Sequence, residues 1–191
     1  MVDLLRTRTP KRLGDLDPRV VEPKAPLCPA AVVVLLERTE GYGVILTKRS
    51  HAVEHHKGEI SLAGGMRDAD DPSLEATALR ELDEEIGVPP GAVRVLGRLD
   101  DIATVTGFLV TPFVCAIDAG RSMRLQSGEV ERVLHVPMQV LRDPAAWFDD
   151  IRTWRGDTYH LRSCRFGDDI IWGATSRILQ HFLAVIPADV L

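Results

Sequence analysis

The sequence lacks the cysteine pairs and long apolar runs that are typical of secreted and membrane proteins. Its three cysteines lie far apart and form no CxxC pair, so neither a disulfide framework nor a cysteine-based zinc site is expected. No apolar run approaches the roughly 20 residues that span a bilayer, and residues 1–6 hold no apolar leader core. We therefore expect reduced, mostly buried cysteines, a cytoplasmic location and no membrane partner.

An excess of positive charge is also missing. The chain has 28 acidic and 23 basic side chains and a formal net charge of -5. Proteins that bind nucleic acid in general carry a basic surface, so this class of partner is not expected. A small anionic substrate remains compatible with the composition, because a few local cations and a metal ion can outweigh the global charge.

The chain has the size of one globular domain. Its 191 residues, 45% of them hydrophobic, are enough to bury a sizeable core. Five prolines fall among charged side chains in residues 1–29 and disrupt regular structure there. We predict a proline-rich N-terminal arm over residues 1–29 and a single domain over residues 30–191.

The pattern of apolar residues predicts a mixture of strands and helices. A β-branched run at 30–37 and a second run at 44–50 flank a glycine-containing turn, which predicts a hairpin. Residues 50–72 predict a long loop with at most a short strand at 59–62. Further strands are predicted at 93–99, 109–117, 130–136 and within 144–171, and an amphipathic helix at 173–186. The predicted fold class is α+β, with helices packed on a sheet.

The clearest helix is predicted over residues 71–87. Asp71 is a suitable N-cap, Pro72 suits the first helical position, and Gly87 suits the position after the last turn. The apolar residues of this segment recur at helical spacing and predict the buried stripe, namely Ala78, Leu79, Leu82 and Ile86.

Three carboxylates share one face of this helix. Glu81, Glu84 and Glu85 stand at positions i, i+3 and i+4, a spacing that we expect to bring them together opposite the leucines. Hard oxygen ligands in such a group favour Mg²⁺ or Mn²⁺. Asp83 points elsewhere, while Arg80 lies one turn before Glu84 and is expected to orient that carboxylate.

The alternative is that these charges form an ordinary solvated helix face. Two glycines upstream, Gly64 and Gly65, weigh against it, because paired glycines allow the backbone to approach a ligand or metal closely. The glycine pair, the capped helix and the acidic face together are more specific than any one of them.

At this point the sequence resembles the Nudix hydrolase family. Residues 80–88, RELDEEIGV, match the second half of the Nudix box at every defined position. The first half departs from the box, because fourteen residues rather than thirteen separate Gly65 from Arg80, and either Asp70 or Asp71 stands in place of a glutamate. This one-residue extension is similar to the coenzyme A pyrophosphatase branch. The resemblance implies an α/β/α sandwich with a mixed sheet, on which the box forms a loop-helix-loop unit.

Other segments are similar to the same branch. Residues 46–50 and 56–65 resemble its additional motif, which precedes the box and is associated with recognition of coenzyme A. Within this region Ala63 replaces a usual proline, and Val53 and Glu54 replace a leucine and an arginine. The resemblance implies hydrolysis of the pyrophosphate bond of coenzyme A to 4'-phosphopantetheine and adenosine 3',5'-bisphosphate.

The reaction class and the resemblance together suggest roles for individual residues. A pyrophosphate anion repels hydroxide, so a divalent cation is needed to neutralise it and to lower the pKa of the attacking water. We expect the metal ligands to be Glu81, Glu85, Glu84 and the carbonyl of Gly65. The predicted substrate contacts are Arg49, Lys57, Arg67 and the Gly64 and Gly65 backbone.

The general base and the substrate stay open at this stage. Glu85 is one candidate for the base, and Glu129 from a distant loop is another, although a lone loop glutamate is more often just an exposed acid.

The alternatives for function are a Nudix enzyme for ADP-ribose, NADH or dinucleoside polyphosphates, and a module that binds a nucleotide without catalysis. A zinc site at His51, His55 and His56 is not expected, because their spacing matches no standard pattern. The oligomeric state is open, with a homodimer as one possibility.

Overall fold

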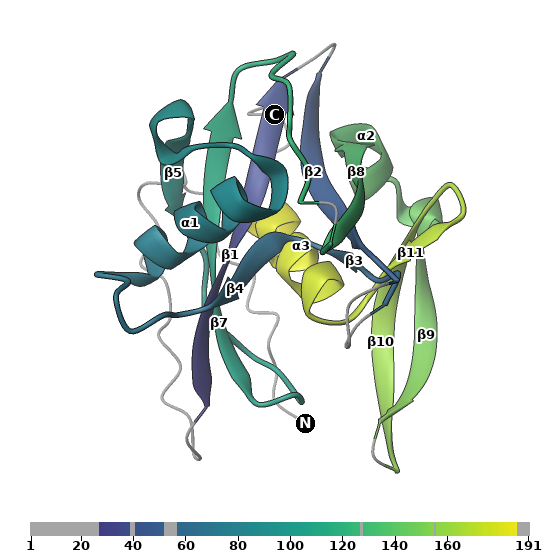
Figure 1. Cartoon of the computed structure of the whole chain (residues 1–191). Helices are drawn as coiled ribbons and strands as arrows, with labels where there is room; N and C mark the ends of the chain where they lie inside the picture. The colour runs from purple at the N-terminus through teal and green to yellow at the C-terminus, as the bar shows by residue number, and fades with distance from the viewer. Residues whose placement is uncertain (1–26, 39–40, 52–56, 127, 155, 187–191) are drawn as a thin grey trace.

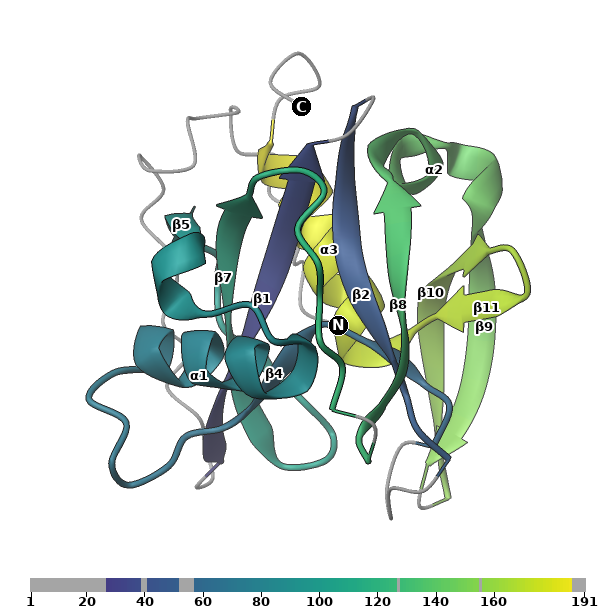
Figure 2. The ribbon, with the colours of Figure 1, turned by 45° about the horizontal axis from the view of Figure 1, so that its top comes forward.

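The computed structural model describes residues 27–38, 41–51, 57–126, 128–154 and 156–186, without the side chain of Trp154. Within these ranges a mixed β-sheet carries a helix on each face: α1 (Leu74–Ile86) on one side and α3 (Gly173–Val185) on the other (Figures 1 and 2). The predicted layered α+β architecture is therefore confirmed. No helix in the described part of the chain is long and apolar enough to cross a membrane.

The sheet is built around β1 (Cys28–Arg38). This strand pairs antiparallel with β2 (Tyr42–Arg49), as the predicted hairpin requires, and parallel with β7 (Phe108–Ile117) along ten residue pairs. Both faces of β1 are covered, which explains its nearly continuous apolar run. Alternate residues enter two separate cores: Val33 and Leu35 face α1, whereas Val34 and Leu36 face α3.

Short strands complete the sheet where β1 and β2 diverge. Residues 35–38 of β1 pair with β2, whereas residues 30–33, nearer the start of β1, pair with β4 (Ala63–Met66). The end of β2 pairs with β3 (Ile60–Ser61). The other edges are occupied by β5 (Arg94–Arg98), β6 (Ile102–Ala103) and β8 (Val130–Pro137). The divergence of β1 and β2 leaves β4 beside the start of β1, where it supports α1.

A second sheet of three strands follows β8 and the short helix α2 (Met138–Arg142). It consists of β9 (Trp147–Trp154), β10 (Asp157–Phe166) and β11 (Asp169–Ile171), and it projects from the main body in Figure 1. Asp169 joins the two sheets, because its carboxylate pairs with Lys48 at 3.3 Å and also with Arg132. The strands predicted within residues 144–171 are therefore present.

Several local expectations are wrong. Residues 63–66 form β4 rather than loop, because pairing with β1 satisfies their backbone groups although two of them are glycines. The helix begins at Leu74, and Ser73 rather than Asp71 is its N-cap, with its hydroxyl accepting the Ala76 N–H at 3.1 Å. The prediction that the cysteines are mostly buried is confirmed, since Cys115 and Cys164 are buried and Cys28 is exposed. Residues 1–26 of the predicted arm lie outside the described ranges, and Cys28 and Pro29 already belong to β1.

Candidate active site

The glycine pair lies in β4, directly under the acidic helix. A Cβ atom on Gly64 would collide with the Ala31 carbonyl and lie 2.6 Å from Val32 Cα, and its φ of +152° disfavours other residues. A Cβ on Gly65 would instead meet the carboxylate of Glu81, lying 2.8 Å from its Oε2. The first glycine therefore allows β4 to pack on β1, and the second allows the Glu81 carboxylate to lie against the backbone.

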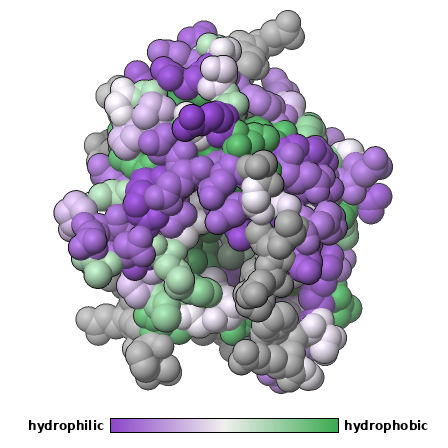
Figure 3. Space-filling model, viewed as in Figure 1, coloured by the Kyte–Doolittle hydropathy of each residue, from purple (hydrophilic) through white to green (hydrophobic). Residues whose placement is uncertain are grey.

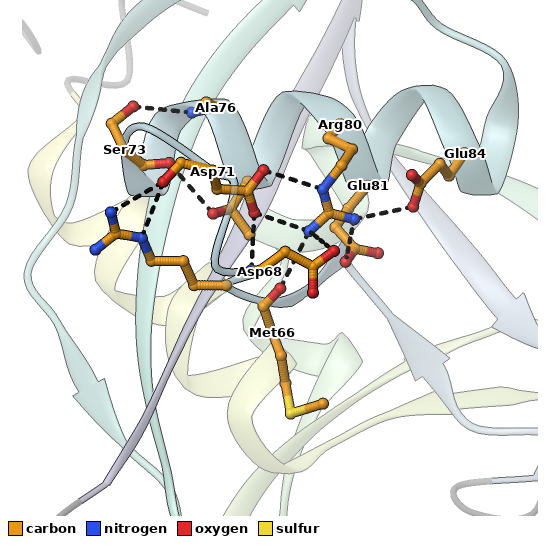
Figure 4. Close-up of polar contacts among 10 residues, drawn as sticks. Met66, Asp68, Asp71, Ser73, Ala76, Arg80, Glu81 and Glu84 are labelled. Carbon is orange, nitrogen blue, oxygen red and sulfur yellow. Dashed lines mark hydrogen bonds and ion pairs between the residues drawn. The ribbon is translucent and has the colours of Figure 1, made fainter.

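Arg80 connects the loop before α1 with the acidic face of the helix (Figure 4). Its Nε and Nη2 donate to the two carboxylate oxygens of Asp71 at 3.1 and 3.0 Å, and Nη2 also donates to the Met66 carbonyl. Its Nη1 donates to Glu81 at 2.9 Å and to Glu84 at 3.0 Å. The expected orientation of Glu84 by Arg80 is thus observed, and it extends to Glu81.

Of the two candidate aspartates before the helix, Asp70 and Asp71, Asp71 is the one that Arg80 contacts. It forms a bidentate pair with Arg80 and also accepts the Asp68 backbone N–H at 3.0 Å. These hydrogen bonds hold the pKa of Asp71 well below its usual range, and the pKa of Arg80 is raised in return. Because Asp71 is engaged in this way, Ser73 caps the helix instead.

The three carboxylates of the helix differ in exposure. Glu84 is exposed and Glu81 is partly buried, but only 3% of Glu85 is accessible, so Glu85 does not stand opposite the leucines as expected. Burial raises the pKa of Glu85 to about 8, against the opposing effect of Arg49 and with the help of Glu81 and Glu129. Burial also raises the pKa of Glu81. An ionised Glu85 therefore requires a compensating positive charge.

Arg49 supplies part of that charge from the end of β2. Its Nη1 lies 4.0 Å from Glu85 Oε1. The pairing of β2 with β8 shifts between Lys48 and Arg49, so that Arg49 stands opposite Val130. Such a bulge changes the direction of a strand and of its side chains. The same shift brings Glu129 beside β2, where its carbonyl accepts the Ser50 N–H at 2.7 Å.

The segment that carries Glu129 packs on the C-terminal end of α1. This connection between β7 and β8, residues 118–129, donates backbone N–H groups from Arg124 to the Ile86 carbonyl and from Gln126 to the Glu85 carbonyl. These carbonyls belong to the last turn of the helix, which leaves them without helical partners. Glu129 is partly buried and contributes to the raised pKa values of both Glu81 and Glu85. The two candidates for the general base therefore belong to one electrostatic cluster.

The cluster has the oxygen ligands that a divalent cation prefers, but its side chains are not arranged around a common point. Glu85 Oε2 is buried and has no hydrogen-bond partner among the described residues, which is the state expected of an unused ligand atom. The Glu81 carboxylate lies directly against Gly65, where any Cβ would displace it. Within the described ranges, however, no three acidic, histidine or cysteine side chains are arranged as a metal site. Arg80 Nη1 donates to one oxygen each of Glu81 and Glu84, so the other oxygen of each carboxylate makes no bond to Arg80.

The other predicted substrate contacts are less tightly associated with the cluster. Arg67 donates twice to the Asp71 carbonyl, at 3.3 and 2.9 Å, and thus supports the loop before α1. Lys57 is exposed. Val53, Glu54, His55 and His56 lie outside the described residues. In the orientation of Figure 1, hydrophilic side chains gather over α1, and the surface is hollowed near the centre of this face (Figure 3).

Comparison with known proteins assigns the class. The NUDIX domain model matches residues 26–153, which include β4, α1 and the segment with Glu129. The chain belongs to this family and is a hydrolase of phosphorus-containing anhydrides, specifically of pyrophosphate-containing substrates. Nudix hydrolases in general use divalent metal ions.

Its relatives include the Nudix hydrolases named NudL of Salmonella paratyphi B and Salmonella newport. Each is 34% identical to this chain over 152 residues, covering 80% of this chain and 79% of NudL. The similar solved structures include a MutT/nudix family protein of Enterococcus faecalis, with a TM-score of 0.53, 15% identity and coverage of 86% of this chain and 64% of that one. Another is the C. elegans Ap4A hydrolase, with a TM-score of 0.50, 15% identity and coverage of 59% and 82%. These two structures support the fold.

Proposed function

We propose that the protein hydrolyses the pyrophosphate bond of coenzyme A or one of its derivatives, with Mg²⁺ or Mn²⁺ as the cofactor. The main support is the position of Arg49, which belongs to the region that resembles the coenzyme A motif and lies 4.0 Å from Glu85. A cation at this distance from a buried carboxylate is suited to receive a phosphate when a metal ion compensates Glu85.

The proposed roles combine the resemblance to the family with the contacts of the cluster. Metal binding is assigned to Glu81, Glu84, Glu85 and the Gly65 carbonyl, and Arg80 orients Glu81 and Glu84. A bound divalent cation would neutralise the pyrophosphate and lower the pKa of the attacking water. Glu85 or Glu129 would accept the proton of that water, since both belong to the same cluster. Phosphate contacts are assigned to Arg49, Lys57, Arg67 and the backbone of Gly64 and Gly65.

A hydrolysis panel tests this proposal. The purified protein is incubated with coenzyme A, 3'-dephospho-coenzyme A, ADP-ribose, NADH and diadenosine tetraphosphate, each with Mg²⁺ and with Mn²⁺. We expect coenzyme A to give 4'-phosphopantetheine and adenosine 3',5'-bisphosphate, identified by mass spectrometry. Efficient turnover of another substrate with no turnover of coenzyme A would leave the Nudix assignment intact but reject the branch. Absence of hydrolysis with specific nucleotide binding would favour the non-catalytic alternative.

Glu54 offers a second test, based on the sequence because this residue lies outside the described ranges. A carboxylate near the bound 3'-phosphate should weaken binding by charge repulsion. Glu54→Arg is therefore expected to lower the KM for coenzyme A more than the KM for 3'-dephospho-coenzyme A, which lacks that phosphate. Equal changes in both KM values would show that residue 54 does not meet the 3'-phosphate.

A further inference from the structure

We propose that Glu37 is a positioning residue for the reaction. It fixes the start of the 118–129 segment and thereby sets the position of Glu129 beside Glu81 and Glu85. The inference rests on the proposed function only in that Glu129 takes part in hydrolysis. It does not depend on which pyrophosphate substrate the protein prefers.

Glu37 is a buried acid near the end of β1, outside the cluster described above. Only 4% of it is accessible. Its Oε1 accepts the Gly120 backbone N–H at 3.1 Å, and its Oε2 lies within hydrogen-bond distance of His135 Nδ1, at 2.8 Å. Burying a carboxylate is unfavourable unless such partners compensate it. Apolar residues fill the other inward positions of β1, so the packing of this strand does not require an acid at position 37.

The two partners of Glu37 belong to distant parts of the chain. Gly120 is 83 residues away, in the first turn of the 118–129 segment, and His135 is 98 residues away in β8. The segment and β8 are consecutive along the chain, so Glu37 binds just after the point where the chain leaves β7 and again within the strand that follows Glu129. A single carboxylate therefore contacts the start of this connection and the strand that follows it.

Between these ends the described part of the segment is held by backbone hydrogen bonds and by apolar contacts with the core under α1. It has no helix or strand among its described residues. Its backbone is fixed by the Gly120 contact, by the Arg124 and Gln126 bonds to the end of α1, and by the Glu129 carbonyl that accepts from Ser50. A Cβ on Gly87 would lie 3.0 Å from Arg124 Cβ, so the segment is in close contact with the helix end. Met123 and Leu125 also pack against the apolar core under α1. The Gly120 bond is the attachment that follows the end of β7, so its loss should loosen the described part of the segment that leads to Glu129.

Such a shift would act on the reaction through Glu129. The bond from Gln126 is made to the carbonyl of Glu85 itself, and Glu129 follows three residues later. A displacement of about 1 Å in a group that must meet a reacting water can cost up to roughly 100-fold in rate. Glu37 touches no reacting atom, so its contribution should appear in kcat rather than in substrate binding.

A set of three variants tests the anchoring. Glu37→Met removes the acceptor for Gly120 at similar volume, Glu37→Gln retains one acceptor oxygen, and His135→Phe removes the other partner while leaving the Gly120 bond. Hydrogen exchange of the Arg124 and Gln126 amides is measured with each protein. We expect faster exchange of both amides in Glu37→Met, recovery toward the wild-type rate in Glu37→Gln, and little change in His135→Phe. Unchanged exchange in a folded Glu37→Met protein would overturn the inference.

Steady-state kinetics test whether the anchor acts through Glu129. On whichever pyrophosphate substrate the wild type hydrolyses, Glu37→Met is expected to lower kcat about tenfold or more with little change in KM. In a Glu129→Gln background the same substitution should have almost no further effect, because coupled residues are non-additive. Additive losses, or a Glu129→Gln variant with normal kcat, would reject the role of Glu37. Failure to hydrolyse coenzyme A alone would reject the substrate assignment and leave this inference standing.

Discussion

At the scale of a single residue, the state of Glu85 decides how the cluster responds to a cation. Its side chain is buried, its pKa is raised to about 8, and its Oε2 has no hydrogen-bond partner among the described residues. Arg49 at 4.0 Å offsets only part of the cost of an ionised carboxylate. A divalent cation would therefore gain both a ligand atom and a negative charge at this position.

Glu85 and Asp83 form a matched pair for mutagenesis. Glu85→Gln retains the size of the side chain but removes its charge, so we expect kcat to fall about 100-fold or more in a folded protein. Asp83 is exposed on another side of the same helix, and Asp83→Asn should change kcat little. Both variants are measured by steady-state kinetics, with circular dichroism as the check on folding. Comparable losses in the two proteins would contradict the assignment of the helix face.

At the scale of an element, β4 places two glycines side by side with different neighbours. Gly64 faces the backbone of β1, which cannot move aside, whereas Gly65 faces the end of the flexible Glu81 side chain. Gly64→Ala should therefore reduce the free energy of unfolding by about 3 kcal/mol. Gly65→Ala should reduce it much less but should weaken Mn²⁺ binding, because Glu81 is displaced. Urea unfolding and calorimetric titration with Mn²⁺ separate the two effects; an equal loss of stability in both variants would contradict this division.

The loop before α1 gives a prediction for pH. The pKa of Asp71 is lowered from its ordinary value of 3.8 by Arg80, so the ionised form is favoured in the folded state. Its contribution to stability is then present in full above the ordinary pKa and is lost as the pH falls below it. Asp71→Asn should be less stable than the wild type at pH 7, and the difference should shrink at pH 3, as measured by urea unfolding. Asp70→Asn, at an exposed position, should show no such difference at either pH.

At the scale of the whole molecule, a metal ion would join parts of the chain that lie far apart in the sequence. The proposed ligands come from β4 and α1, and the cluster includes the end of β2 and the segment with Glu129. Mn²⁺ at about 100 times its Kd should add roughly 2.7 kcal/mol, or a rise in Tm of roughly 5–10 °C for a chain of this size. Differential scanning calorimetry with Mn²⁺ and with EDTA measures this rise, which should be absent in Glu85→Gln. An equal rise in that variant would place the metal elsewhere.

The large elements could be predicted from the sequence because their patterns are strong. The hairpin of β1 and β2, the stripe of α1 and the C-cap at Gly87 follow from apolar periodicity and glycine. By contrast, β4 has two glycines among four residues, and only its pairing with β1 makes it a strand. The start of α1 was misplaced because Asp71 is engaged by Arg80, an interaction that spacing alone does not reveal. The short helix α2 was not predicted, since five residues carry too little periodicity.

The site was predicted in its composition but not in its arrangement. Spacing groups the carboxylates of α1, yet the burial of Glu85 depends on Arg49 and on the segment that covers the helix end. Glu37 was missed, although an acid at the end of an otherwise apolar strand was the available signal. Its partners lie 83 and 98 residues away, and no local pattern reports contacts of that range.

The parallel pairing of β1 with β7 also governs how the molecule can form. Parallel neighbours cannot be joined by a tight turn, and here β1 ends at Arg38 while β7 begins only at Phe108. Chains dominated by such distant contacts fold slowly, typically over milliseconds to seconds. During synthesis, the edge of β1 that pairs with β7 stays unpaired until β7 has left the ribosome. Until then, the nascent chain exposes the unpaired edge of a β-branched strand. We expect the nascent chain to depend most on chaperones during this interval.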